Sequence, residues 1–181
     1  DGINLLDPGK TPHENTQFLL VLACILKAVN KHADLLRESA ADPGNDHRLG
    51  ANEAPPAIIS MFLGNLEEIL EGLATGKPVA SADGGKLEIG VNSLPKLPRD
   101  LTDRNRTSPF AFTGNKFEFR MVPSSESVAG PNVVLNTIAA EIFSEFAEAL
   151  EKSTDKKATV TKLIIDTYNA HKRVVFNGNG Y

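Results

Sequence analysis

Hydrophobic residues recur at helical spacing in four stretches of the chain. Helices are expected over residues 16–40, 57–73, 132–152 and 158–172. In each of them apolar side chains return every three or four positions, which places them on one face of a helix. The first helix is apolar almost all round in its first half, so it should be buried on several sides. In the third, a row of glutamates follows the opposite, water-facing side.

Residues 104–123 follow a different pattern. In their last part, residues 116–121, charged and apolar side chains alternate. Side chains of a strand point to opposite faces in turn, so one face of this strand is apolar and the other is charged. A second aromatic run precedes it, and the turn signal Thr113-Gly114-Asn115 separates the two. The stretch therefore predicts a β-hairpin. Its apolar face is Phe117, Phe119 and Met121, and its charged face is Lys116, Glu118 and Arg120.

The segments between these elements read as loops. Residues 40–56, AADPGNDHRLGANEAPP, form a long irregular stretch, and loops of that length are often functional. A turn-rich segment follows the second helix, residues 87–91 suit a short strand, and 94–103 is a proline-punctuated connector.

Composition narrows the class of protein. The chain has 181 residues, 41% hydrophobic and 23% charged, which suits one folded domain or a large piece of a longer protein. Its net charge of −4 and lack of a basic stripe argue against a nucleic-acid partner. The apolar run 18–26 is too short to span a membrane, and Cys24 within it is expected to be a buried hydrophobe. The chain lacks an initiator Met, and both ends look like cuts within loops.

The charged face of the hairpin has two interpretations. It is either a solvated outer face or the lining of a site. A carboxylate beside a guanidinium, with Arg104 and Arg106 just upstream, combines an oxygen ligand for Mg²⁺ with donors for phosphate or carboxylate. The loop around Arg48 and Glu53 is open to the same two interpretations. The four histidines lack the spacing of a metal-binding helix.

Two motifs together resemble glutamine synthetase. HRLGANEAPPAI, residues 47–58, is similar to the flap segment of that family, and RNRTSPFAFTGNKFEFR, residues 104–120, is similar to its active-site strand pair. The amino-acid sequence of the flap segment and the long insertion before the second motif resemble those of the type III, large-subunit branch. The resemblance covers nearly the whole chain and implies an α+β fold, a fragment of the catalytic domain in which long helices pack with an antiparallel hairpin. Its implied parts are a flap loop at 44–56, an insertion at about 62–103, the active-site hairpin at 104–123 and C-terminal helices at 132–172.

The resemblance also implies roles for six residues. On the hairpin, Glu118 matches a ligand of the catalytic Mg²⁺ or Mn²⁺, and Lys116 lies where the family has a basic residue on the nucleotide side. Arg120 and Arg48 match arginines that bind the carboxylate of the substrate glutamate. The two catalytic matches are Arg106, which stabilises the transferring phosphoryl group and contacts the nucleotide, and Glu53, the flap residue that closes the site and binds and deprotonates ammonium.

The implied protein ligates ammonia to glutamate with ATP as co-substrate, through a γ-glutamyl phosphate intermediate. It is expected to be a cytoplasmic homo-oligomer of stacked rings, with small-molecule substrates and neither a nucleic-acid nor a membrane partner. The sequence departs from the family pattern in two places, because Ala111 stands where the family has an arginine and the flap is one residue shorter. The upstream metal-binding glutamates and the N-terminal domain are not within these 181 residues, so the isolated chain is expected to be inactive.

Two alternatives remain open at this point. One is a γ-glutamyl amide ligase of the same superfamily that uses an amine other than ammonia. The other is a non-catalytic assembly module, in which the charged face of the hairpin is simply solvated.

Overall fold

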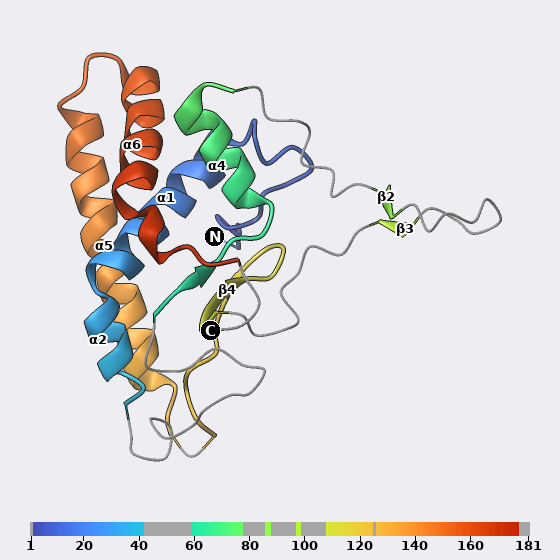
Figure 1. Ribbon diagram of the computed structural model, residues 1–181. Coiled ribbons are helices and arrows are strands. Elements are labelled where there is room, and N and C mark those ends of the chain that lie inside the picture. The colour runs from blue at the N-terminus through green and yellow to red at the C-terminus, as the bar shows by residue number, and fades with distance from the viewer. Residues whose placement is uncertain are drawn as a thin grey trace.

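Three helices pack against one another (Figure 1). They are α1 (Thr16–Lys31), α5 (Ala129–Glu151) and α6 (Lys156–His171). The computed structural model describes residues 2–41, 59–77, 108–124 and 126–177, and the backbone of two short strands at 86–87 and 97–98. The predicted helices near the C-terminus are confirmed, with ends that differ by one to three residues.

The predicted helix 16–40 is two helices, so this expectation was wrong in its detail. At His32 the backbone leaves the helical region, with φ −116° and ψ 30°. The chain then continues as α2 (Ala33–Glu38), which contacts both α1 and α5. The change of direction carries Leu36, which is fully buried, into the core.

The predicted helix 57–73 was also wrong in its first part. Met61–Phe62 is a short strand, β1, and the helix α4 covers only Leu66–Thr75. Gly64, with φ 58°, lies between them in a left-handed conformation that ends the strand before the helix begins. Gly76 ends α4 in the same conformation, with φ 67°. Residues 57 and 58 lie outside the described part of the chain.

The sheet contains β1, β4 (Phe110–Phe112) and β5 (Phe117–Phe119), in the order β1-β4-β5. The predicted hairpin is confirmed: β4 and β5 are antiparallel. The sheet as a whole is mixed, because β1 pairs with β4 in parallel. A second, two-stranded sheet joins β2 (Lys86–Leu87) and β3 (Leu97–Pro98). Only Leu87 of the predicted strand 87–91 belongs to it, and the remainder lies outside the described residues.

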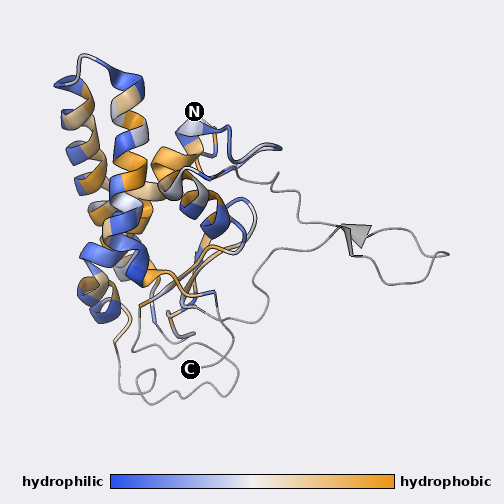
Figure 2. Ribbon diagram, turned by 45° about the horizontal axis from the view of Figure 1, so that its top comes forward, coloured by the Kyte–Doolittle hydropathy of each residue, from blue (hydrophilic) through white to orange (hydrophobic). Residues whose placement is uncertain are grey.

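The hydrophobic core lies between the three long helices and the sheet. Figure 2 shows hydrophobic residues gathered on the helix sides that face one another. Phe18 of α1 contacts Phe112 of β4, with 6.1 Å between the ring centroids, and so joins the helical layer to the sheet. Cys24 is fully buried, as predicted, and its burial raises the pKa of the thiol to about 12. Among the described helices, none combines the length and the hydrophobicity that crossing a bilayer requires.

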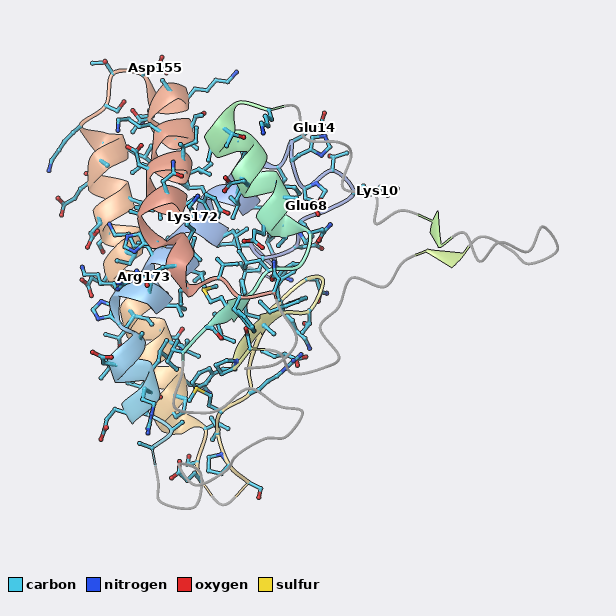
Figure 3. The ribbon with its side chains drawn as sticks, in the orientation of Figure 1. Lys10, Glu14, Glu68, Asp155, Lys172 and Arg173 are labelled. Carbon is cyan, nitrogen blue, oxygen red and sulfur yellow. The ribbon has the colours of Figure 1, made fainter. Side chains whose placement is uncertain are left out.

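Two residues that follow the end of α6, Lys172 and Arg173, connect it to α4 and to α1 (Figure 3). Lys172 begins the short 3-10 helix η1 (Lys172–Val174) and its Nζ lies 3.3 Å from Oε2 of Glu71 on α4. Arg173 donates from Nε to Oδ1 of Asn30 on α1, at 3.0 Å. These contacts fix the direction in which the chain leaves α6 toward β1.

Two glutamates of the row that was expected to face water also form ion pairs with α1. Glu145 pairs with Lys27 and, at 2.8 Å, with Lys31, and Glu141 pairs with Lys31 at 2.5 Å. The side chains of Glu141 and Glu145 remain 42% and 37% exposed, so they lie at the edge of the interface between the two helices. The glutamate row therefore contributes to helix pairing as well as to the surface.

We expect Leu22→Ala to lower the free energy of unfolding by about 2–5 kcal/mol, because it leaves a cavity at a fully buried position of α1. Urea unfolding of the purified chain measures this loss. Val133→Ala is the matched control, since Val133 on α5 is 66% exposed and its truncation should change stability by less than about 0.5 kcal/mol. Equal losses for the two variants would contradict this assignment of the core.

We expect the pairing of α1 with α5 to weaken in acid. Hydrogen bonds from Lys27 and then Lys31 lower the pKa of Glu145 below its usual 4.5. The folded state therefore gains stability from this carboxylate above that pH, and loses it as the pH falls through the lowered pKa.

Lys27→Met keeps the apolar stem of the side chain and removes its charge. We expect it to lower the thermal midpoint at about pH 7, and to reduce the further drop seen on going to about pH 3. Circular dichroism at the two pH values measures both. The control is Lys162→Met, which removes a surface ion pair with Asp166 within α6 and should leave both values nearly unchanged.

Candidate functional site

The β4–β5 hairpin presents the predicted charged face, and a tight turn fixes its shape. Thr113 donates its backbone N–H to the carbonyl of Lys116 at 2.8 Å, and Gly114 between them has φ 97°, which a residue with a side chain rarely adopts. The tip is also held from outside the hairpin, because Asn4 donates its side-chain amide to the carbonyl of Asn115 at 2.6 Å.

The aromatic face of β5 packs on the core, as predicted. The ring of Phe117 stacks on Phe110 at 4.7 Å between centroids, with an interplanar angle of 9°. Phe119 meets the same ring edge-on at 6.1 Å, and Met121 is buried. Because the side-chain period is two, this packing directs Lys116, Glu118 and Arg120 to the opposite face.

Glu118 lies between two cations on that face. One carboxylate oxygen, Oε2, is 3.2 Å from Nε of Arg120, and the other, Oε1, is 3.9 Å from Nζ of Lys116. The exposed fractions of the side chains fall along the strand, from 64% for Lys116 through 43% for Glu118 to 17% for Arg120. The side chain of Glu118 is therefore reachable from solvent, whereas most of the Arg120 side chain is covered.

This face is not a simple solvated surface. Ala111 lies directly opposite Glu118 in the strand register, hence on the same face, and it is fully buried. The side chain of Arg120, at the same end of the face, is also mostly covered. This charged face is therefore covered at the end of Arg120 and open to solvent at the end of Lys116.

The structure brings together three of the six predicted site residues: Lys116, Glu118 and Arg120. The other three, Arg48, Glu53 and Arg106, lie outside the described residues, as do the whole predicted flap loop and Arg104. The first part of the expected insertion, which begins at about residue 62, contains the last residue of β1 and the whole of α4.

Glu118 is suited to be one ligand of a divalent cation. It offers a carboxylate oxygen, the donor that Mg²⁺ and Mn²⁺ prefer, on a side chain that solvent can reach. Within the described ranges no three His, Cys, Asp or Glu side chains gather as a metal cluster. At this face the described residues thus offer a metal ion one ligand, Glu118. The two cations beside it, Lys116 and Arg120, suit the binding of anions.

Sequence reasoning missed two residues that lie just before strands β1 and β4, Ser60 and Ser108. Both are buried, with exposed fractions of 6% and 0%, and their hydroxyl groups are 3.0 Å apart. Serine is so common in loops that neither position is distinctive in the sequence. The only signal is that Ser60 immediately precedes the apolar strand β1 and Ser108 lies two residues before β4.

Comparison with known proteins agrees with the resemblance found in the motifs. No protein-family profile matches the chain. It is 52% identical over 184 residues to a type-3 glutamine synthetase from Dictyostelium discoideum, 46% over 182 residues to a glutamine synthetase from Butyrivibrio fibrisolvens and 41% over 189 residues to one from Bacteroides fragilis. Each match covers 99% of this chain. The chain is homologous to a segment of type-3 glutamine synthetase.

The homologous segment is only part of such a protein. The chain spans about a quarter of the length of these glutamine synthetases, between 25% and 26%. Because the matches extend along nearly the whole chain, they include both motifs on which the resemblance rests. The helix-rich fold with its small mixed sheet agrees with the α+β class expected from that resemblance.

Proposed function

We propose that this chain supplies part of the catalytic domain of a glutamine synthetase, an enzyme that ligates ammonia to glutamate with ATP. The observation that carries the proposal is the 52% identity along 99% of the chain to a type-3 glutamine synthetase. The partly enclosed pairing of Glu118 with Arg120 gives it physical support, because the chemistry needs a metal ligand and an anion-binding group side by side.

The proposed reaction has two steps. The γ-phosphoryl group of ATP is transferred to the side-chain carboxylate of glutamate, which gives ADP and γ-glutamyl phosphate. The lone pair of ammonia then attacks the acyl carbon, the bond to the phosphate oxygen breaks, and glutamine and phosphate are released. In such transfers, positioning and neutralisation of charge account for most of the catalysis.

We assign the charged face of the hairpin to the binding of metal and anions. Glu118 would provide one oxygen ligand to Mg²⁺ or Mn²⁺, and the bound cation would neutralise charge on the nucleotide phosphates. Arg120 would bind the carboxylate of glutamate, where its low exposure of 17% reduces competition from water. Lys116, at the exposed end of the face, would contact the nucleotide.

The remaining roles follow the motif resemblance. Arg48 would be a second contact for the glutamate carboxylate, and Arg106 would stabilise the phosphoryl group in transfer. Glu53 on the flap would close the site, exclude water from the acyl phosphate and accept a proton from ammonium. We propose that the complete protein is a homo-oligomer of stacked rings.

We expect Glu118→Ala in the complete enzyme to lower kcat/KM by roughly 10- to 100-fold, or more, and to raise the Mg²⁺ concentration needed for half-maximal rate. Coupled measurement of ADP release across a Mg²⁺ series tests both. Glu148→Ala is the control, because Glu148 is a surface residue of α5 that forms an exposed ion pair with Lys152 at 3.2 Å. Unchanged activity and metal dependence in Glu118→Ala would show that the metal assignment is wrong.

We expect the isolated 181-residue chain to form no glutamine from ATP, glutamate and ammonia. The reason is that the described residues gather one carboxylate ligand at the proposed metal position, whereas a divalent cation of this type needs several. Glutamine would be measured by chromatography, with the complete enzyme as positive control. Sustained turnover by the pure chain would contradict this expectation.

A further inference from the structure

Two buried serines, which lie just before strands β1 and β4, form a hydrogen-bond relay that ends at a backbone carbonyl. Ser60 donates from its hydroxyl to the hydroxyl oxygen of Ser108 at 3.0 Å, and Ser108 donates to the backbone carbonyl of Phe176 at 3.0 Å. Each hydroxyl has one proton to donate, so the two bonds use both protons in one direction. A buried hydroxyl without such partners is costly, which means that this arrangement depends on all three groups being in place.

The accepting carbonyl belongs to a C-terminal segment that is itself fixed on the sheet. Phe176 donates its backbone N–H to the carbonyl of Met61 at 2.8 Å, beside a parallel bridge between Met61 and Val175. The next residue, Asn177, accepts from the backbone N–H groups of Leu63 and Gly64 at 2.9 and 3.0 Å. The segment after η1 thus extends the sheet on the far side of β1.

The relay reaches the charged face through one further residue. Pro109 follows Ser108 directly, and its carbonyl accepts the backbone N–H of Arg120 at 2.7 Å. Phe110, the first residue of β4, donates its N–H to the carbonyl of Ser60 at 3.3 Å. The backbone of Arg120 is therefore connected to the C-terminal segment by an unbroken path of hydrogen bonds and a single peptide link.

We infer that the relay from Ser60 through Ser108 to the carbonyl of Phe176 is a positioning device for the hairpin strand that carries Glu118 and Arg120. Ser60 and Ser108 act as positioning residues, because they hold the chain at the start of β4. Pro109, at that point, accepts the backbone N–H of Arg120 and so fixes where Arg120 lies. The inference rests on the proposed function insofar as Arg120 is taken to bind the carboxylate of glutamate. It adds that the C-terminal segment participates in the geometry of that site.

The test uses the complete enzyme with Ser108→Ala, which removes the centre of the relay. Hydrogen exchange of the Arg120 amide, followed by mass spectrometry on peptides of β5, should become several-fold faster, because the strand loses its fixed support. The KM for glutamate should rise roughly tenfold, with a smaller change in kcat per active site. A purely structural loss would reduce the number of active sites and leave the KM unchanged.

Two further variants control the experiment. Ser144→Ala also removes a hydroxyl that donates to a backbone carbonyl, but on the exposed side of α5, and should change neither measurement. Ser60→Ala is the milder relay variant, to be used if Ser108→Ala does not fold. It removes the donor to Ser108 and keeps the hydrogen bond to Phe176, so both effects should be smaller and in the same direction.

Unchanged exchange of the Arg120 amide in the relay variants would overturn the inference, whatever the kinetics. Faster exchange together with a higher KM for glutamate would support both the relay and the role of Arg120. Faster exchange with an unchanged KM would support the relay as the support of the hairpin, and would count against Arg120 as the carboxylate-binding residue in the proposed function.

Discussion

The burial of α1 is the constraint on which the rest of the described structure depends. The first half of the helix is apolar on almost every side, and nine of its 16 residues are buried. Such a helix is stable only when other elements cover it on several sides at once. Helices α5 and α6 cover two of them, and the ring of Phe112 meets α1 from the sheet through Phe18. The position of the hairpin thus follows from the need to cover this helix.

That packing decides what the hairpin can present on its other face. Because Phe117 and Phe119 are directed to the core, Glu118 and Arg120 have to point away from it. The side chain of Arg120 is nevertheless only 17% exposed, and its Nε lies 3.2 Å from the carboxylate of Glu118. In the proposed function they would provide a metal ligand and an anion-binding group side by side on one strand, which is the arrangement that the proposed chemistry requires.

The candidate site was predictable from the sequence only as far as one strand extends. Lys116, Glu118 and Arg120 lie at alternate positions, so the period of two was enough to place them on one face. Their burial was not predictable, because it depends on residues distant in the sequence that pack around β4. Ser60 and Ser108 show the same limit, since 48 positions separate two hydroxyl groups that are in contact. The roles of Arg48, Glu53 and Arg106 remain predictions from the motifs.

Local patterns in the sequence determined the helices α5 and α6, the hairpin and the burial of Cys24. In each case a short-range periodicity or an apolar neighbourhood contained the necessary information. Tertiary structure alone decided the break at His32, the strand at Met61 and the bridge between Met61 and Val175. The stretch around Met61 has apolar residues at helical spacing, yet it forms a strand because hydrogen bonds to β4 and to Phe176 satisfy its backbone groups. Those partners are tens of residues away in the sequence, and a local pattern does not record which distant segment will supply them.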